Sequence, residues 1–221
     1  MVFINCTPKD VDTYYYKRQG FDDRGWGCVY RCAQTVMATL GYAQHDPEVR
    51  MPDGNKLKLL MPHIPDMMYV LGVPHSASPK QMWIEPKQVR DLLVHYCGPR
   101  RSLGHRTTQG LTWEPRLIGF GVAANQDLLL RTSREDFDTE YADWRPFHND
   151  VVRHLRRHES PVVLDDGTSG MCVTGFRGTL GSASGEYFMV DPHATGSGLQ
   201  FKTESVHEYY TRRRMVMALV S

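Results

Sequence analysis

The chain has 221 residues, of which 41% are hydrophobic and 10% aromatic, as expected for a globular protein with a substantial core. Its 26 basic and 25 acidic residues leave a formal net charge of +1, so no overall field attracts nucleic acid or an anionic membrane. No stretch reaches the roughly 18 apolar residues of a membrane span, and the N-terminus lacks a signal-peptide pattern. We therefore expect a soluble, intracellular, monomeric protein with a single domain over residues 1–221 and no nucleic-acid partner.

The helices are predicted in the first two thirds of the chain. Apolar residues recur every three or four positions from Val29 to Leu40, which indicates an amphipathic helix, and Gly41 is expected to stop it. Two further amphipathic helices are predicted from Glu85 to Tyr96 and from Phe147 to His158, each with charge on the face opposite its apolar side. The polar, glycine-broken segment from Gly98 to Thr112 favours a loop.

The C-terminal third is predicted to form strands. Short runs rich in β-branched and aromatic residues alternate with glycine-rich turns. The runs are Ser160 to Leu164, Met171 to Gly178, Glu186 to Val190 and Met215 to Val220. They predict an antiparallel sheet, with the turn from Gly181 to Gly185 joining the second and third runs as a hairpin. Helices first and strands last indicate an α+β fold.

A cysteine stands where the first predicted helix begins, in the sequence "GWGC". The thiolate is the reactive form of cysteine, and a helix start stabilises negative charge, so we expect a lowered thiol pKa for Cys28. Gly25 and Gly27 carry no side chains, which lets a substrate backbone approach the sulfur, and Trp26 offers an apolar wall. Cys28 is therefore a candidate nucleophile and Gly25, Trp26 and Gly27 are candidate substrate-binding residues. The alternative is a turn followed by a small buried cysteine.

A cysteine nucleophile needs a base, and the base needs an orienting partner. Asp191, Pro192 and His193 follow the third predicted strand. Pro192 fixes its own φ and favours an extended Asp191, so the side chains of Asp191 and His193 point to one side. Asp191 can hold one ring nitrogen of His193 and leave the other free to face Cys28. We expect His193 to act as the base and Asp191 as its orienter.

An oxyanion needs hydrogen-bond donors, and the Cys28 backbone N–H supplies one. The nearby carboxylates of Asp22 and Asp23 are expected to repel negative charge, so a second donor is required. The phenols of the "YYY" run are neutral donors at pH 7, and Tyr16 is preferred among them. Packing of these tyrosines into the core is the alternative interpretation.

Several motifs together carry a resemblance. "YYYKRQGFDDRGWGCVYR" and "DPHATG" resemble the tyrosine, Gly-Trp-Gly-Cys-x-Tyr-Arg and Asp-Pro-His motifs of the cysteine proteases specific for the ubiquitin-fold modifier. "QMWIEPKQVRDLL" and "ESPVVLDDG" resemble two further segments of that family. The resemblance implies a papain-like fold with Cys28 as nucleophile, His193 as base, Asp191 as orienter and Tyr16 as oxyanion donor. It also implies that no cofactor or metal takes part.

The same resemblance implies the substrate, which is the ubiquitin-fold modifier and its conjugates. The expected reaction is cleavage after the modifier's C-terminal glycine, for precursor maturation, deconjugation or both. We expect a cytoplasmic protein, with recruitment to conjugates at the endoplasmic reticulum surface as a further expectation. Asp165 and Asp166 stand where the family usually has glycines, and Ala194 where an aromatic is common. The loop over the substrate tail is therefore expected to differ in shape.

Four alternatives stay open at this point. Autophagy proteases share Gly-Trp-Gly-Cys and Asp-Pro-His, and a catalytically silent protein that binds a modifier would carry the same fold. Cys28 and Cys32 could bind a metal with Cys172 or a histidine. The basic runs Arg153 to His158 and Arg212 to Arg214 could form a nucleic-acid patch, although solvated surface is the favoured interpretation. Five cysteines, an odd number, indicate free thiols rather than a disulfide framework.

Overall fold

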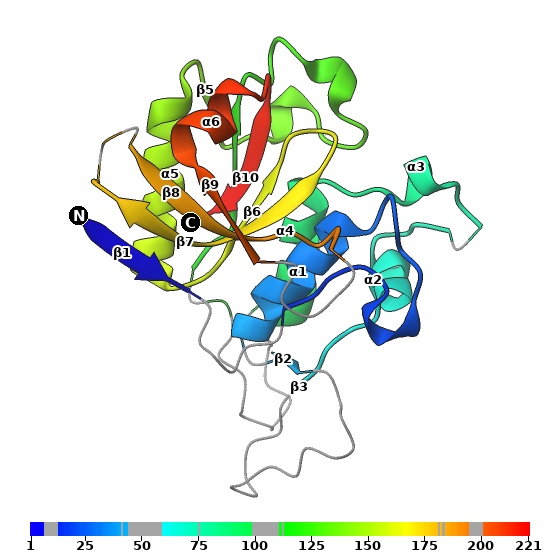
Figure 1. The fold of residues 1–221 in the computed structure, drawn as a ribbon. Helices are drawn as coiled ribbons and strands as arrows, with labels where there is room; N and C mark the ends of the chain where they lie inside the picture. The colour runs from blue at the N-terminus through cyan, green and yellow to red at the C-terminus, as the bar shows by residue number, and fades with distance from the viewer. Residues whose placement is uncertain are drawn as a thin grey trace, which may run out of the picture.

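The computed structural model describes residues 1–6, 13–40, 42–43, 59–74, 76–98, 111, 113–180, 182, 184–194 and 201–221. In that part of the chain an eight-stranded sheet runs in the order β5-β4-β10-β6-β7-β8-β9, with β1 also paired to β7 (Figure 1). The strands are β1 (Val2–Asn5), β4 (Arg116–Phe120), β5 (Thr139–Tyr141), β6 (Val162–Asp165), β7 (Gly170–Gly178), β8 (Gly185–Val190), β9 (Phe201–Ser205) and β10 (Val216–Val220). A small parallel sheet joins β2 (Tyr42–Ala43) and β3 (Leu59–Leu60).

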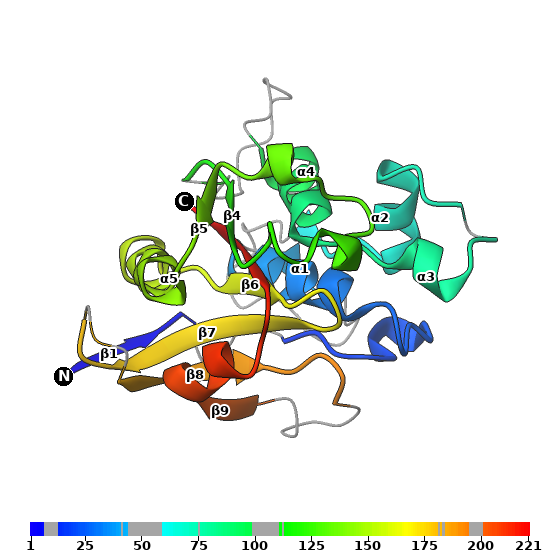
Figure 2. The same cartoon turned by 90° about the horizontal axis from the view of Figure 1, so that it is seen from above.

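Helices cover both faces of the large sheet (Figure 2). On one face α1 (Cys28–Thr39) and α4 (Pro86–Cys97) pack against each other and against β6, with α2 (Ile64–Val70) in the same apolar cluster. On the other face lie α5 (Trp144–His158) and α6 (Val206–Thr211). The short helix α3 (Pro79–Met82) precedes α4. The sheet therefore separates two cores, and the predicted nucleophile belongs to the α1 side.

Alternation along β6 decides which side chains face α1. Val162 and Leu164 pack in the core under α5, whereas Val163 packs in the core under α1. Because successive side chains of a strand point to opposite faces, Asp165 shares the α1 face with Val163. Cys172 on the neighbouring strand β7 also belongs to the α1 core. A carboxyl and a thiol are thus placed on the inner face that packs against the predicted nucleophile's helix.

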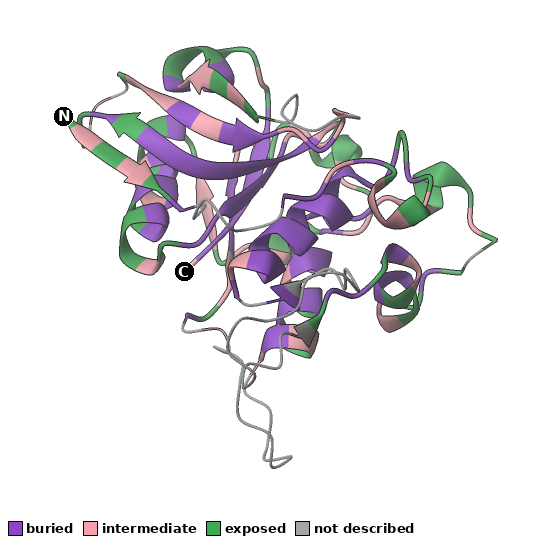
Figure 3. Cartoon of the chain, turned by 60° about the horizontal axis from the view of Figure 1, so that its bottom comes forward, coloured by how far each residue is buried: buried purple, intermediate pink, exposed green. Residues whose placement is uncertain are grey.

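The three predicted helices are confirmed as α1, α4 and α5. Glu85 caps α4 together with Gln88, and the Asp143 carboxylate caps α5 by accepting the Arg145 N–H at 3.1 Å. Helix α1 differs from the expectation in one respect, because its polar side is buried along with its apolar side (Figure 3). The segment that leads to Cys28 covers that polar side. The expected stop at Gly41 and nearly all of the loop predicted from Gly98 to Thr112 lie outside the described residues.

The four predicted strands are confirmed as β6, β7, β8 and β10. Their pairings with each other are antiparallel, and the register Gly178 to Gly185 confirms the predicted hairpin. The strands β1, β4, β5 and β9 were not predicted, and β4 pairs with β5 in parallel. The α+β class is confirmed. In the described part of the chain, no helix has both the length and the apolar character to cross a membrane.

Candidate active site

Cys28 is the first residue of α1, as predicted. Its N-cap is Gly27, which has no side chain to satisfy the free N–H groups of the first turn. The N–H of Gly170, at the start of β7, donates to Cys28 Sγ across 3.4 Å. A Cβ at Gly170 would lie 2.5 Å from Val29 Cγ2, so glycine is what lets the strand approach the helix this closely. The sulfur therefore lies between the N-terminus of α1 and the first residue of β7.

The expected lowering of the Cys28 thiol pKa is wrong for this structure. Burial raises the pKa of Cys28 to about 12, and the Asp165 carboxyl adds to the rise. The N–H groups of Gly170 and Val29 and the Tyr16 phenol act in the opposite direction, but they do not outweigh burial. The sequence pattern gave the helix start correctly and could not show that the thiol is fully buried. In this environment the resting form of Cys28 is the neutral thiol.

Asp191 and His193 are paired as predicted. Asp191 Oδ1 lies 2.7 Å from His193 Nδ1 and also accepts the His193 backbone N–H at 3.0 Å. Burial acts to raise the pKa of Asp191, but these two hydrogen bonds and Lys202 outweigh it and lower the pKa to about 2. The carboxylate is therefore ionised at neutral pH and accepts a hydrogen bond from a protonated Nδ1. In the tautomer with the proton on Nδ1, Nε2 of His193 is left as an acceptor.

Tyr16 lies between the predicted nucleophile and the predicted base. Its ring meets the His193 ring edge to face, with the centroids 5.2 Å apart. Burial and the neighbouring Cys28 thiol raise the pKa of Tyr16, so the phenol is neutral at any ordinary pH. The phenol oxygen is buried, and no group in the described residues is aligned to hydrogen-bond with it. Tyr16 is thus a neighbour of both His193 and Cys28, and its phenol lies beside the sulfur as a possible donor.

A buried ion pair fixes the segment that carries Tyr16. Arg31, on the inner side of α1, donates from Nε and Nη2 to the two carboxylate oxygens of Asp23 at 2.8 and 3.0 Å, and both side chains are fully buried. Asp23 Oδ1 also accepts the backbone N–H of Lys17, the residue after Tyr16, at 2.9 Å. Lys17 has a left-handed backbone with φ of 63°, which few non-glycine residues adopt without support.

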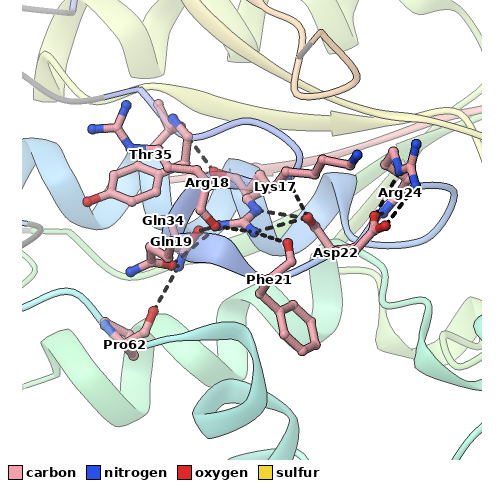
Figure 4. Close-up of polar contacts among 12 residues, drawn as sticks. Lys17, Arg18, Gln19, Phe21, Asp22, Arg24, Gln34, Thr35 and Pro62 are labelled. Atoms are coloured by element: carbon pink, nitrogen blue, oxygen red, sulfur yellow. Dashed lines mark hydrogen bonds and ion pairs between the residues drawn. The ribbon is translucent and has the colours of Figure 1, made fainter. Parts of the chain in front are cut away.

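The remaining donors of Arg31 complete this network. They reach the carbonyl of Arg18 and the side-chain oxygens of Gln19 and Gln34, and Gln34 in turn donates to the carbonyl of Pro62 (Figure 4). The expectation that Asp23 repels an oxyanion is therefore wrong, because the Arg31 guanidinium neutralises it. Asp22 is different, since it forms an exposed pair with Arg24. Arg31 belongs to the quoted cysteine motif, but its role was not predicted, although an arginine within an apolar helix is a signal of a buried partner.

Glycine is required on either side of Trp26 for two different physical reasons. Gly25 has φ of 84°, where a side chain would strain the backbone. A Cβ at Gly27 would lie 2.3 Å from Asp23 Oδ2. The buried ion pair therefore leaves no room for a side chain at this position. Trp26 is buried between Phe21 and Tyr30, with both rings edge to face. Of the three predicted substrate-binding residues, only Gly25 is exposed.

A cleft of about 400 Å³ begins at Gly25. Its walls come from α3 and the residue after it, from the segment of Leu128 and Leu130, and from the turn at Gly167 and Thr168. The lining residues are Gly25, Pro79, Lys80, Trp83, Asp127, Leu128, Leu130, Gly167 and Thr168. Gly25 lies shortly before Cys28 in the sequence. Thr168 lies shortly before Gly170, whose N–H contacts the sulfur. Two segments that line the cleft therefore continue directly into the residues around the thiol, although Cys28 itself does not line it.

The sequence found parts of this cleft and missed the rest. Gly25 and Trp83 lie in segments singled out by their motifs, whereas Leu128 and Leu130 had no recognisable pattern and are unusually exposed for leucines. The turn that follows β6 is held by Asp166, whose Oδ1 accepts the N–H groups of Thr168 and Ser169. Asp166 also pairs with Arg213 at 3.0 Å. This turn, where aspartates replace the glycines of the family pattern, supplies one wall of the cleft.

The other cysteines are free thiols. All five are buried, and Cys32 lies in the α1 core next to Cys172, as expected for a packing residue. Within the described residues, no group of three or more histidine, cysteine, aspartate or glutamate side chains has an arrangement that could hold a metal ion. Arg212 is exposed, and Arg213 is engaged with Asp166 and Glu204.

Comparison with known proteins gives matches of three kinds. Residues 4–77 match the model of peptidase family C78. A protein of Oryza sativa subsp. japonica named "Probable Ufm1-specific protease" is 26% identical over 195 residues, which cover 88% of this chain and 24% of that protein. The crystal structure of UfSP from C. elegans superposes with a TM-score of 0.57 at 16% identity, over 99% of this chain and 34% of that one.

The chain thus spans about a quarter of the rice relative and about a third of the C. elegans protein. The superposition extends over the helical side that carries Cys28 and the sheet that carries Asp191 and His193. The chain has the papain-like α+β fold of the C. elegans protein, and the resemblance to the proteases specific for the ubiquitin-fold modifier is confirmed.

Proposed function

We propose that this chain is a cysteine protease that cleaves after the C-terminal glycine of the ubiquitin-fold modifier. The observation that carries the proposal is the position of Tyr16, whose ring meets His193 and whose phenol lies beside the Cys28 thiol. A nucleophile, an oriented base and a donor for negative charge are the three parts that acyl transfer requires. The family match and the names of the rice and C. elegans relatives support the choice of modifier.

The reaction starts from the neutral thiol of Cys28, with His193 as the acceptor of its proton. His193 Nε2 accepts the Cys28 proton while Nδ1–H stays bound to the Asp191 carboxylate, so a thiolate and an imidazolium form together. The sulfur attacks the carbonyl carbon of the terminal glycine, and the tetrahedral oxyanion accepts hydrogen bonds from the Cys28 N–H and the Tyr16 phenol. His193 then gives its proton to the leaving amine. Water, deprotonated by His193, hydrolyses the thioester and restores the thiol.

The cleft supports an extended tail as the substrate. Gly25 presents backbone without a side chain at its edge, and Trp83, Leu128 and Leu130 give it apolar walls. An extended peptide that ends in glycine fits such a site because its last residue needs no room for a Cβ. The single lysine and the single aspartate at the rim add little net charge.

A thiol-reactive probe tests the proposal directly. The modifier carrying a vinyl sulfone in place of its terminal carboxylate is expected to form a covalent adduct with the wild type and none with Cys28→Ala. Cys32→Ala is the matched control, because it removes a buried thiol from the same helix and should keep the adduct. Noncovalent binding without an adduct at any pH would instead indicate a catalytically silent binding protein.

Substrate comparison tests the choice of modifier. Precursors of the ubiquitin-fold modifier, of ubiquitin and of an autophagy modifier are incubated with the protein side by side, and release of each C-terminal extension is measured. Preferential cleavage of the first supports the proposal, and preferential cleavage of the autophagy modifier contradicts it. Cytoplasmic location and a monomeric state stay predictions from the composition.

A further inference from the structure

Asp165, the last residue of β6, carries a carboxyl with no access to solvent. One oxygen, Oδ1, accepts the backbone N–H of Gly167 at 2.6 Å. The other oxygen, Oδ2, is buried and has no hydrogen-bond partner among the described residues. An ionised carboxylate in this position would have one hydrogen bond from the described residues and no exposure to solvent, which is a costly state in a protein interior.

The carboxyl faces the nucleophile's side of the sheet. Asp165 pairs with Gly170 in the register between β6 and β7, and the Gly170 N–H donates to Cys28 Sγ. Val163, two residues earlier on β6, packs in the α1 core, so Asp165 points to the same side. The strand pairing and the alternation along β6 independently place the Asp165 carboxyl near the N-terminus of α1.

The acidic side chains near Asp165 disfavour its negative charge. Glu85, at the start of α4, and Asp166, next in the chain, are both acidic and raise its pKa. Cys28 and Cys32 face it from α1, and the nearest residues of β7 and β10 in register are Gly170 and Met217. None of these residues is a cation. Burial, the largest effect, raises the pKa of Asp165 to about 8, against which the Gly167 N–H acts only partly.

We propose that Asp165 is a positioning residue that keeps a protonated carboxyl beside Cys28 in the resting protein, and that its ionisation opposes formation of the Cys28 thiolate. The inference deepens the proposed function, since it concerns the same nucleophile. When Asp165 is neutral, proton transfer from Cys28 to His193 places the new thiolate beside no other negative charge. When Asp165 has lost its proton to solvent, the thiolate forms next to a carboxylate in a medium of low polarity. The carboxyl thus limits the nucleophile at alkaline pH.

Alkylation with iodoacetamide measures this effect without a substrate. Iodoacetamide is neutral, so its rate with Cys28 follows the thiolate fraction, and Cys28→Ala gives the background of the other cysteines. Asp165→Asn keeps the shape and removes the charge. Its Cys28 is expected to react as fast as wild type near pH 6 and about tenfold faster near pH 9, a shift of about one unit in the thiol midpoint. Asp91→Asn, an exposed carboxylate on α4, is the charge-matched control and should follow wild type.

Two results overturn the proposal. Superimposable alkylation profiles for wild type and a folded Asp165→Asn show that the carboxyl does not act on the thiol. A wild-type protein with ¹³C-labelled aspartate carboxyls provides a second test that needs no variant. One resonance should titrate near pH 8, and titration of all resonances below about pH 5 means that Asp165 is ionised at rest. Neither measurement depends on cleavage of the modifier, so failure of the proposed protease activity leaves both outcomes readable.

Discussion

The backbone N–H of Tyr16 donates a hydrogen bond of 2.8 Å to the carbonyl of Pro192. This bond joins the segment before the nucleophile to the turn that holds the base, although the two are far apart in sequence. Since Pro192 lies between Asp191 and His193, the contact sets the phenol and the imidazole against each other by the backbone rather than by side chains alone. Cys28 has no such tie to His193, so its alignment depends on the segment from Tyr16 to Gly27.

Tyr16→Phe should lower kcat about 100-fold with little change in KM, because the phenol is expected to bind the oxyanion and not the ground-state substrate. The free energy of unfolding should stay the same or rise, since the lost hydroxyl is buried and has no hydrogen bond among the described residues. Tyr30→Phe removes a second buried hydroxyl of the same kind from α1 and should keep kcat. Equal losses of kcat in the two variants would remove Tyr16 from the mechanism.

Asp191→Asn should lower kcat about 10³- to 10⁴-fold, because an amide no longer selects the His193 tautomer with the proton on Nδ1. Lys202→Met removes a weaker partner, whose Nζ lies 3.4 Å from Asp191 Oδ2, and should cost less than about tenfold. Steady-state hydrolysis of a modifier precursor measures both. A loss for Lys202→Met as large as that for Asp191→Asn would contradict the assigned role of the aspartate.

The lowered pKa of Asp191, about 2, also predicts how stability depends on pH. A carboxyl whose pKa is lower in the folded state stabilises the protein above its unfolded pKa, near 4, and this contribution of about 2 kcal/mol is lost as the pH falls to 2. Urea unfolding at pH 6 and pH 3 should show a steeper acid loss in wild type than in Asp191→Asn. Parallel losses in the two proteins would mean that the aspartate is not paired in solution.

Asp23→Asn should destabilise the protein by about 3 kcal/mol, because it leaves the Arg31 guanidinium buried without a counter-ion. Where the variant stays folded, kcat should fall while KM changes little, since the Lys17 N–H loses the acceptor that holds Tyr16 in place. Asp22→Asn disrupts the exposed pair with Arg24 and is the matched control, with no measurable change expected. Destabilisation with kcat unchanged would limit the ion pair to a structural role.

Gly27→Ala and Gly25→Ala should fail in different ways. At Gly27 the new methyl group would meet the Asp23 carboxylate, so the loss is one of stability, of about 1–3 kcal/mol. At Gly25 the methyl group meets no atom within 4 Å but strains a left-handed backbone at the cleft edge, so KM for the modifier should rise. Thermal unfolding and steady-state kinetics of both variants separate the two effects. An unchanged KM for Gly25→Ala would mean that the substrate tail does not run past this residue.

The sequence predicted those parts of the molecule that depend on local pattern. The helix start at Cys28, the hairpin between β7 and β8 and the pairing of Asp191 with His193 each follow from spacing and turn chemistry over a few residues. The strands β1 and β4 were not predicted, and their pairing partners, β7 and β10, lie far along the chain, so no hairpin turn marks either pair in the sequence.

What the sequence could not give was the effect of burial. Cys28 was expected to have a lowered pKa because the helix start is local, but the strand that buries the sulfur is more than a hundred residues away. Asp23 was expected to repel an oxyanion for the same reason, since it was considered apart from the helix whose Arg31 pairs with it. Electrostatic properties of a site depend on every segment around it, and pattern analysis treats one segment at a time.

The large sheet is completed late in the chain, and this has a consequence for biosynthesis. Cys28 is synthesised before the imidazole of His193, which follows β8, and β10, which lies between β4 and β6 in the sheet, is made later still. Until then the sulfur has neither a proton acceptor nor the surrounding groups that define it as a nucleophile. A nascent chain that ends before His193 therefore lacks the imidazole that is expected to take the thiol proton.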